Sequence, residues 1–131
     1  MEQPSAGGQS KKQINRPSSL SFYSECDDTD YPVILKIMNY LNGNLAIMLQ
    51  TKGEEGPESF AVITVNFPTE LLPPNQAYLD TNNVPGIEQF VKENGLGKPM
   101  YQHHVSGFCT YPLYEFDLFR CLEHGELANS K

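Results

Sequence analysis

Hydrophobic, β-rich segments joined by short turns predict an antiparallel sheet in the first half of the chain. Two β-rich segments, PVILKIMNYL and LAIMLQTK, flank Asn42 and Gly43. An Asn-Gly pair between such segments is typical of a tight hairpin, because both turn residues accept positive φ. A two-residue loop would place Ile37 opposite Met48. Both faces of this hairpin are largely apolar, so we expect it at the centre of the sheet.

Further strands follow the hairpin. Residues 59–67 (SFAVITVNF) and the short segment 77–80 have strand patterns, and residues 108–116 form an aromatic segment that predicts the final strand. Pro112 should confine that final strand to an edge or a bulge. Residues 97–107, which hold His103, His104 and Ser106, are expected to form a loop.

One short amphipathic helix is predicted between these strands. Good capping residues and Pro85 indicate a start near Val84. Ile87, Phe90 and Val91 have the spacing of one apolar stripe that must dock on a sheet. Asn94 and Gly95 stop the helix, and a last helical turn is expected over Phe119 and Leu122.

These elements together predict an α+β fold. We expect a twisted antiparallel sheet of about four to six strands, with the Asn-Gly hairpin at its centre and one main helix packed on one face. Residues 1–20 are rich in Ser, Gly, Gln, Pro and Lys, which predicts a flexible tail. Residues 21–131 are expected to form a single domain.

The charge of the chain restricts its partners. The formal net charge is −7, and residues 1–20 contain three bases and one acid, so the remainder has 15 acids against 6 bases. Such a body repels phosphate backbones, so we expect no direct binding of nucleic acid and favour a basic protein partner. Neither a membrane-spanning segment nor a secretory signal is evident, and three irregularly spaced cysteines suit a reducing compartment, which together predict a cytoplasmic protein.

Metal and cofactor chemistry is not expected. The acidic segment of residues 25–30 lacks the glycine and the distal glutamate of a calcium loop. Zinc ligation by His103, His104, Cys121 and His124 would lack the paired short spacings of zinc sites. The sequence therefore predicts no cofactor and no metal.

A ligand pocket between the helix and the final strand is the alternative to protein binding. Cys109, His104 and Asp80 are the residue types of a thiol hydrolase, but a cysteine within an aromatic strand is typical of an inert buried thiol. Asp80 and the neighbouring asparagines could instead satisfy their own turn. We therefore predict no catalytic residues, and the candidate pocket comprises Asp80, Asn82, Asn83, His104 and Cys109.

The segments DTNNVPGIEQFVKENGLGKP and SGFCTYPLYEFDL carry a family resemblance. They resemble a family of small proteins encoded on conjugative and other mobile elements of Gram-positive, often gut-dwelling bacteria, catalogued as a domain of unknown function. The resemblance implies no enzymatic activity. It implies a setting among accessory genes, where small acidic proteins often inhibit host defence nucleases such as those of CRISPR systems.

The predicted function is therefore non-catalytic binding to a basic protein or nucleoprotein complex, most concretely an anti-CRISPR-like inhibitor of a host defence nuclease. Loop acids would compete with nucleic acid for a basic channel. Exposed tyrosine among carboxylates in the final strand would add contact area. The expected binding residues are Glu25, Asp27, Asp28, Asp30, Glu54, Glu55, Glu58, Tyr111, Glu115 and Asp117.

Overall fold

The structure, a computed structural model, describes residues 18–128. Residues 1–17 of the predicted tail, and residues 129–131, lie outside the described residues. Strands make up 53% of the described residues, and they accompany two short helices, which is compatible with the α+β class. The elements are β2 (Leu20–Ser24), β3 (Thr29–Asn39), β4 (Leu45–Gly53), β5 (Gly56–Val62), β6 (Thr64–Val65), β7 (Gln76–Leu79), α2 (Ile87–Glu93), β8 (Gly97–Ser106), β9 (Cys109–Phe116), α3 (Leu118–Glu123) and β10 (Gly125–Leu127).

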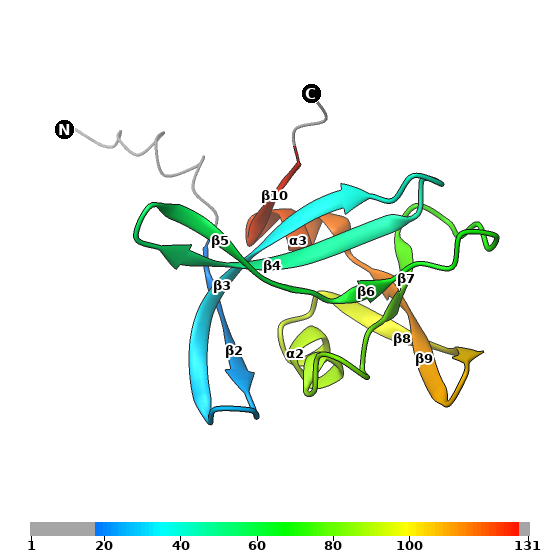
Figure 1. The fold of residues 1–131 in the computed structure, drawn as a ribbon. Coiled ribbons are helices and arrows are strands. Elements are labelled where there is room, and N and C mark those ends of the chain that lie inside the picture. Colours follow the sequence, from blue (N-terminus) through cyan, green and yellow to red (C-terminus); the bar gives the residue numbers. More distant parts are fainter. Residues whose placement is uncertain (1–17, 129–131) are drawn as a thin grey trace.

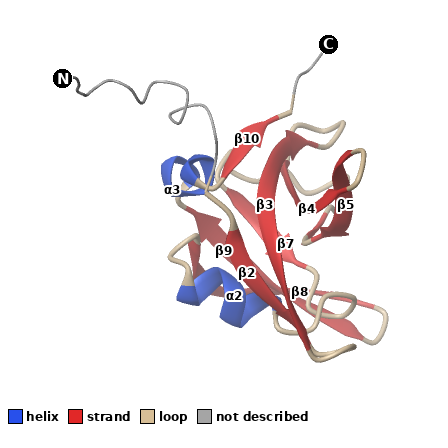
Figure 2. Ribbon diagram, turned by 90° about the vertical axis from the view of Figure 1, so that its left-hand side faces the viewer, coloured by secondary structure: helices blue, strands red, loops and turns tan. Residues whose placement is uncertain are grey.

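The strands form two sheets (Figure 1). The first has the order β10-β3-β4-β5, and β2 pairs with the N-terminal part of β3. Its pairs are antiparallel except for β10, which runs parallel to β3. The second sheet has the order β6-β7-β9-β8 and is antiparallel throughout. Figure 2 shows α2 and α3 apart from each other, and the apolar stripe of α2 belongs to the core.

One segment joins the two sheets. Ile63 lies between β5 and β6; its N–H donates to the carbonyl of Ile47 (3.0 Å), and its carbonyl accepts from the N–H of Asp80 (2.8 Å). The chain therefore leaves the first sheet and enters the second without a long loop. The side chains between the sheets form one core, which includes Val33, Leu35, Ile37, Leu45, Ile47, Leu49, Ile63, Leu79, Ile87, Val91, Tyr114 and Cys121.

The central hairpin is present, but its predicted register is wrong by one residue. Strand β3 ends at Asn39 and β4 begins at Leu45, but the N–H of Tyr40 still donates to the carbonyl of Asn44 (2.8 Å), so the turn proper has three residues, Leu41–Gly43, with Gly43 at φ 92°. Ile37 therefore lies opposite Ile47 and not opposite Met48. This register gathers the branched apolar side chains of both strands on the inner face, whereas a slip of one residue would mix them with polar ones.

The main helix begins later than predicted. Its first residue is Ile87, and its N-cap is Gly86, which has φ 86° and gives no side-chain cap. The predicted stripe is confirmed, because Ile87, Phe90 and Val91 are buried. The second helix, α3, starts after Asp117, whose side chain accepts from the N–H of Arg120.

The residues that α3 buries differ from the prediction. Cys121 is fully buried, whereas Phe119 is 86% exposed and Leu122 is 37% exposed. The helix therefore packs on the core through Cys121, together with the half-buried Leu118. Among the described residues, neither helix is long and apolar enough to cross a membrane.

Two predictions about the last strands are wrong. Residues 97–106 form strand β8 and not a loop. Strand β9 lies inside its sheet, between β7 and β8, so Pro112 is not at an edge, but the alternative of a bulge agrees with the structure, because Pro112 pairs with His103 where the register of the two strands shifts. The irregularity lies in the neighbouring strand, where the register shifts between Pro99 and His103 and Tyr101 has φ 60°. Phe108 lies in the β8–β9 turn, fully exposed, instead of opening the final strand.

Candidate functional site

Unpaired negative charge dominates the described surface. Residues 18–128 contain 15 acidic and 5 basic side chains, a net charge of −10. The ion pairs among these residues join Lys98 to Glu115, His104 to Glu70 and Arg120 to Glu123. Most carboxylates therefore have no cationic partner within the described part of the chain.

Four exposed carboxylates gather where β2 turns into β3. This first acidic tip comprises Glu25, Asp27, Asp28 and Asp30. Two tyrosines of the flanking strands hold it together. Tyr23 donates its hydroxyl to Oδ1 of Asp28 (2.5 Å), and Tyr31 donates its hydroxyl to Oδ2 of Asp27.

The pKa of Tyr23 reflects this local charge. It is raised first by the hydrogen bond to Asp28, then by burial, and then by the negative charges of Glu25, Asp30 and Asp27. A phenol whose ionisation is opposed by several carboxylates lies in a region of negative potential. The first acidic tip therefore attracts cations.

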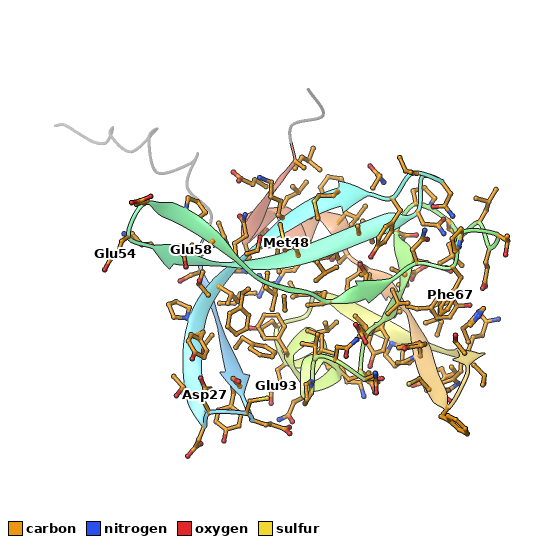
Figure 3. The ribbon with its side chains drawn as sticks, viewed as in Figure 1. Asp27, Met48, Glu54, Glu58, Phe67 and Glu93 are labelled. Atoms are coloured by element: carbon orange, nitrogen blue, oxygen red, sulfur yellow. The ribbon has the colours of Figure 1, made fainter. Side chains whose placement is uncertain are left out.

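A second acidic tip lies at the β4–β5 turn and comprises Glu54, Glu55 and Glu58, all exposed. Figures 1 and 2 both show the two hairpins diverging, so the tips are separate. Figure 3 shows Glu54 and Glu58 at one hairpin, and Asp27 at the other on the same side as Glu93 of α2. The chain thus presents two negative projections and not one continuous acidic face.

A groove runs between the first hairpin and α2. It has a volume of about 480 Å³ and receives carboxylates from both walls, two from the hairpin and one from the helix. We name it the hairpin–helix groove, and its lining is Ser21, Phe22, Tyr23, Glu25, Asp30, Gly86, Gln89, Phe90, Glu93 and Asn94.

A second groove of about 590 Å³ contains two of the other predicted binding residues, Glu115 and Asp117. Both are engaged. Glu115 lies 3.7 Å from Lys98, which also lines the groove, and Asp117 accepts the N–H of Arg120 (3.1 Å) as the cap of α3. This groove mixes both signs of charge and therefore has no preference for a basic partner.

The candidate pocket residues separate into local contacts. Asp80 accepts from both the backbone N–H (3.1 Å) and the side-chain amide (3.0 Å) of Asn83, and Asn82 is exposed. His104 makes a 2.9 Å contact between its Nδ1 and Oε1 of Glu70. Neither groove described above is lined by any of these residues or by Cys109.

Cys109 and Tyr111 lie close together on β9. The pKa of Tyr111 is raised, first by its side-chain interaction with Cys109 and then by burial, and the charge of Asp80 adds to the rise. The register of β8 and β9 places His104 directly opposite Tyr111. Tyr111 is half-buried against Phe67, with ring centroids 5.8 Å apart. It is therefore less available as contact area than predicted.

The sequence patterns did not predict a cluster of side chains around Glu70. Glu70 accepts the hydroxyl of Tyr78 (2.6 Å) and contacts His104, whose ring stacks on Phe67 at 3.5 Å between centroids. Burial, followed by the bond to Glu70, raises the pKa of Tyr78 to about 12. The cluster fastens residues 66–75 to the outer face of the second sheet. No local sequence pattern pairs Glu70 with a histidine 34 positions away.

Metal ligation has no support among residues 18–128, where no group of three acidic, histidine or cysteine side chains is arranged to hold an ion. Of the three cysteines, Cys26 is exposed, Cys109 is half-buried and Cys121 is buried, and all are free thiols. Burial is the main cause that raises the pKa of Cys121 to about 12, so its thiolate is scarce.

Comparison with known proteins gives one match. A family model described as a domain of unknown function (DUF4313) matches residues 34–127, from β3 to β10. No curated protein and no solved structure matches the chain. The matched region includes the central hairpin, both helices and all of the second sheet.

Proposed function

The chain belongs to the DUF4313 family, a domain of unknown function, and we propose that it acts without catalysis, by binding a basic protein surface. The observation that carries this proposal is the pair of acidic tips, Glu25–Asp30 and Glu54–Glu58, on a body with a net charge of −10 over residues 18–128. Projecting carboxylates speed and orient docking on a positively charged partner.

The partner we propose is a nucleic-acid-binding protein or complex of the host. Its Lys- and Arg-lined channel would accept the acidic tips in place of phosphates, so the protein would act as an inhibitor. The family resemblance in Asp80–Pro99 and Ser106–Leu118 suggests a mobile-element gene acting in the cytoplasm, and defence nucleases of the CRISPR type are the concrete candidates. A chain this acidic is itself unsuited to binding DNA or RNA.

Competition against nucleic acid tests the proposal. Candidate defence nuclease complexes are loaded with labelled DNA or RNA, and displacement by the full chain is measured at low and physiological ionic strength. We expect displacement to weaken as salt rises, because exposed charge pairs are screened. A variant with both tips neutralised by amide residues should lose displacement: Glu25→Gln, Asp27→Asn, Asp28→Asn, Asp30→Asn, Glu54→Gln, Glu55→Gln and Glu58→Gln.

A control variant with two exposed acids replaced outside the tips tests the contribution of charge elsewhere on the surface. Glu123, the last residue of α3, and Glu126, in β10, are also exposed and belong to neither tip. Their replacement by glutamine should leave displacement nearly unchanged. If the tip variant displaces nucleic acid as well as the unmodified chain for every candidate complex, the nucleic-acid-mimic proposal is wrong.

The alternative function is ligand binding or thiol-dependent hydrolysis. It is supported by the His104–Glu70 contact, because a carboxylate on Nδ1 fixes the tautomer and orientation of a histidine base. Against it, Asp80 is bound to its own neighbour Asn83, and neither groove is lined by Asp80, His104 or Cys109. Turnover of any ester or amide substrate that is lost in Cys109→Ser and in His104→Gln, with the fold retained, would favour this alternative.

A further inference from the structure

We propose that the hairpin–helix groove is the seat of an arginine side chain supplied by the partner protein. This inference deepens the proposed function and rests on it for the basic character of the partner. The groove shares Glu25 and Asp30 with the first acidic tip, but it is a concave site of about 480 Å³, which lies within the range of about 300–1,000 Å³ typical of ligand-binding clefts.

Negative charge enters the groove from opposite walls. Glu25 and Asp30 belong to the hairpin, whereas Glu93 belongs to the last turn of α2. A cleft lined by one sign of charge with apolar material beneath it concentrates the field and attracts the opposite charge. Within residues 18–128, no lysine, arginine or histidine forms an ion pair with these three carboxylates.

Among the described basic side chains, that of Arg120 reaches the end of the groove but does not neutralise its carboxylates. Arg120 donates its Nε–H to the carbonyl of Asn94 (3.1 Å), while its Nη1 lies 3.0 Å from Oε1 of Glu123. Its charge is therefore already paired. The only described side-chain bond to the carboxylate of Glu93 comes from the neutral amide of Gln89 (2.7 Å).

Aromatic rings favour a guanidinium over an ammonium group here. Phe22 and Phe90 line the groove and are 3% and 5% exposed, with ring centroids 5.3 Å apart, so they give it an apolar base. Tyr23 also lines it and is 48% exposed. A guanidinium is planar, weakly hydrated and able both to stack on a ring and to pair with carboxylates, whereas an ammonium group is strongly hydrated.

Titration with peptides tests the inference on the full chain. The probe is a short arginine-rich peptide, compared with a lysine peptide and a citrulline peptide of the same length, by calorimetry at physiological ionic strength. We expect the arginine peptide to bind about threefold or more tightly than the lysine peptide, because only arginine combines stacking with pairing. The citrulline peptide, which has no charge, should not bind.

Two variants with the same change in charge locate the site. The groove variant carries Glu25→Gln, Asp30→Asn and Glu93→Gln, and the second-tip variant carries Glu54→Gln, Glu55→Gln and Glu58→Gln. We expect the groove variant to bind the arginine peptide about tenfold more weakly, and the second-tip variant to stay within about threefold of the unmodified chain. If the groove variant loses its fold, the single change Glu93→Lys on the exposed side of α2 should give the same loss.

Three results would overturn the inference. The first is an equal loss of peptide binding in both variants, and the second is equal binding of the arginine and lysine peptides. The third is peptide binding that appears only after removal of residues 1–17, which carry Lys11, Lys12 and Arg16. The last result would mean that the chain's own basic segment occupies the groove. Failure of the proposed function is distinguishable, because it would leave peptide binding intact while no nuclease complex loses its nucleic acid.

Discussion

The hydroxyl of Tyr114 links the second sheet to the main helix, and its removal gives a quantitative test of the fold. Tyr114 is fully buried and donates to Oε1 of Glu88 on α2 (2.6 Å). Burial, followed by this bond, raises the pKa of Tyr114, so the phenol stays protonated and remains a donor. Tyr114→Phe keeps the ring in the core and removes only this connection.

The expected loss follows from the type of bond. A hydrogen bond to a charged group contributes about 1.5–3 kcal/mol to stability. A carboxylate that has lost its donor costs less when water can reach it than when it is fully buried. Glu88 is half-buried, so we expect Tyr114→Phe to lower the free energy of unfolding by about 1–2 kcal/mol. For a domain of this size the melting temperature should fall by about 3–5 °C per kcal/mol.

Urea denaturation followed by circular dichroism provides the assay. The midpoint should fall for Tyr114→Phe while the slope stays constant, since the surface exposed on unfolding is unchanged. Tyr101→Phe is the control, because Tyr101 is 86% exposed. A double-mutant cycle with Glu88→Ala should show coupling of about 1 kcal/mol or more. Additive effects, or a Tyr114→Phe midpoint equal to that of the unmodified chain, would refute the reasoning.

Three further predictions concern strand contact, thiol reactivity and alkaline stability. Gly125→Ala should destabilise by about 1–3 kcal/mol in the same urea assay, because a Cβ at Gly125 would lie 2.2 Å from a carbonyl oxygen of β3; the exposed Leu127→Ala should not. With a thiol-specific chromogenic reagent at neutral pH, the exposed Cys26 should react at once. Cys121 should react only after unfolding, because Cys121 is buried and its pKa is raised to about 12. Rapid labelling of Cys121 in the native chain would contradict its burial. The pKa of Tyr78 is raised from 10.0 to about 12 in the folded state, so the stability that this group contributes below pH 10 should be lost between about pH 10 and 12. Denaturation measured across this pH range should show a smaller loss of stability for Tyr78→Phe than for the unmodified chain. The same pH dependence in both proteins would exclude the contribution of Tyr78.

The local parts of the fold could be predicted from the sequence, because they depend on neighbouring residues. The Asn-Gly hairpin and the apolar stripe of α2 are both where their patterns indicated. The register was missed because the loop includes Leu41, which is fully exposed. The division into two sheets was missed because it depends on distant pairs, such as Ile63 with Ile47, that no local pattern encodes.

The candidate site shows the same limit. The acids of both tips lie in exposed hairpin turns, as turn-rich acidic segments predicted. The sequence could not show that Glu93 lies across a groove from Asp30, because the packing of α2 beside the hairpin depends on Phe22 meeting Phe90. Nor could it show that His104 contacts Glu70, since a segment far along the chain covers that face of the sheet.

The pairing of β10 with β3 has a consequence for the order of folding. β3 can join β2 and β4 through short turns, but its parallel partner at Gly125–Leu127 lies about ninety residues further along the chain. Closing so large a loop is entropically costlier and slower than forming the hairpins. During synthesis on the ribosome, one backbone edge of Leu35–Ile37 therefore stays unpaired until the roughly ninety residues that precede β10 have emerged. A chain that ends before Gly125 would leave this edge uncovered permanently and open to intermolecular strand pairing.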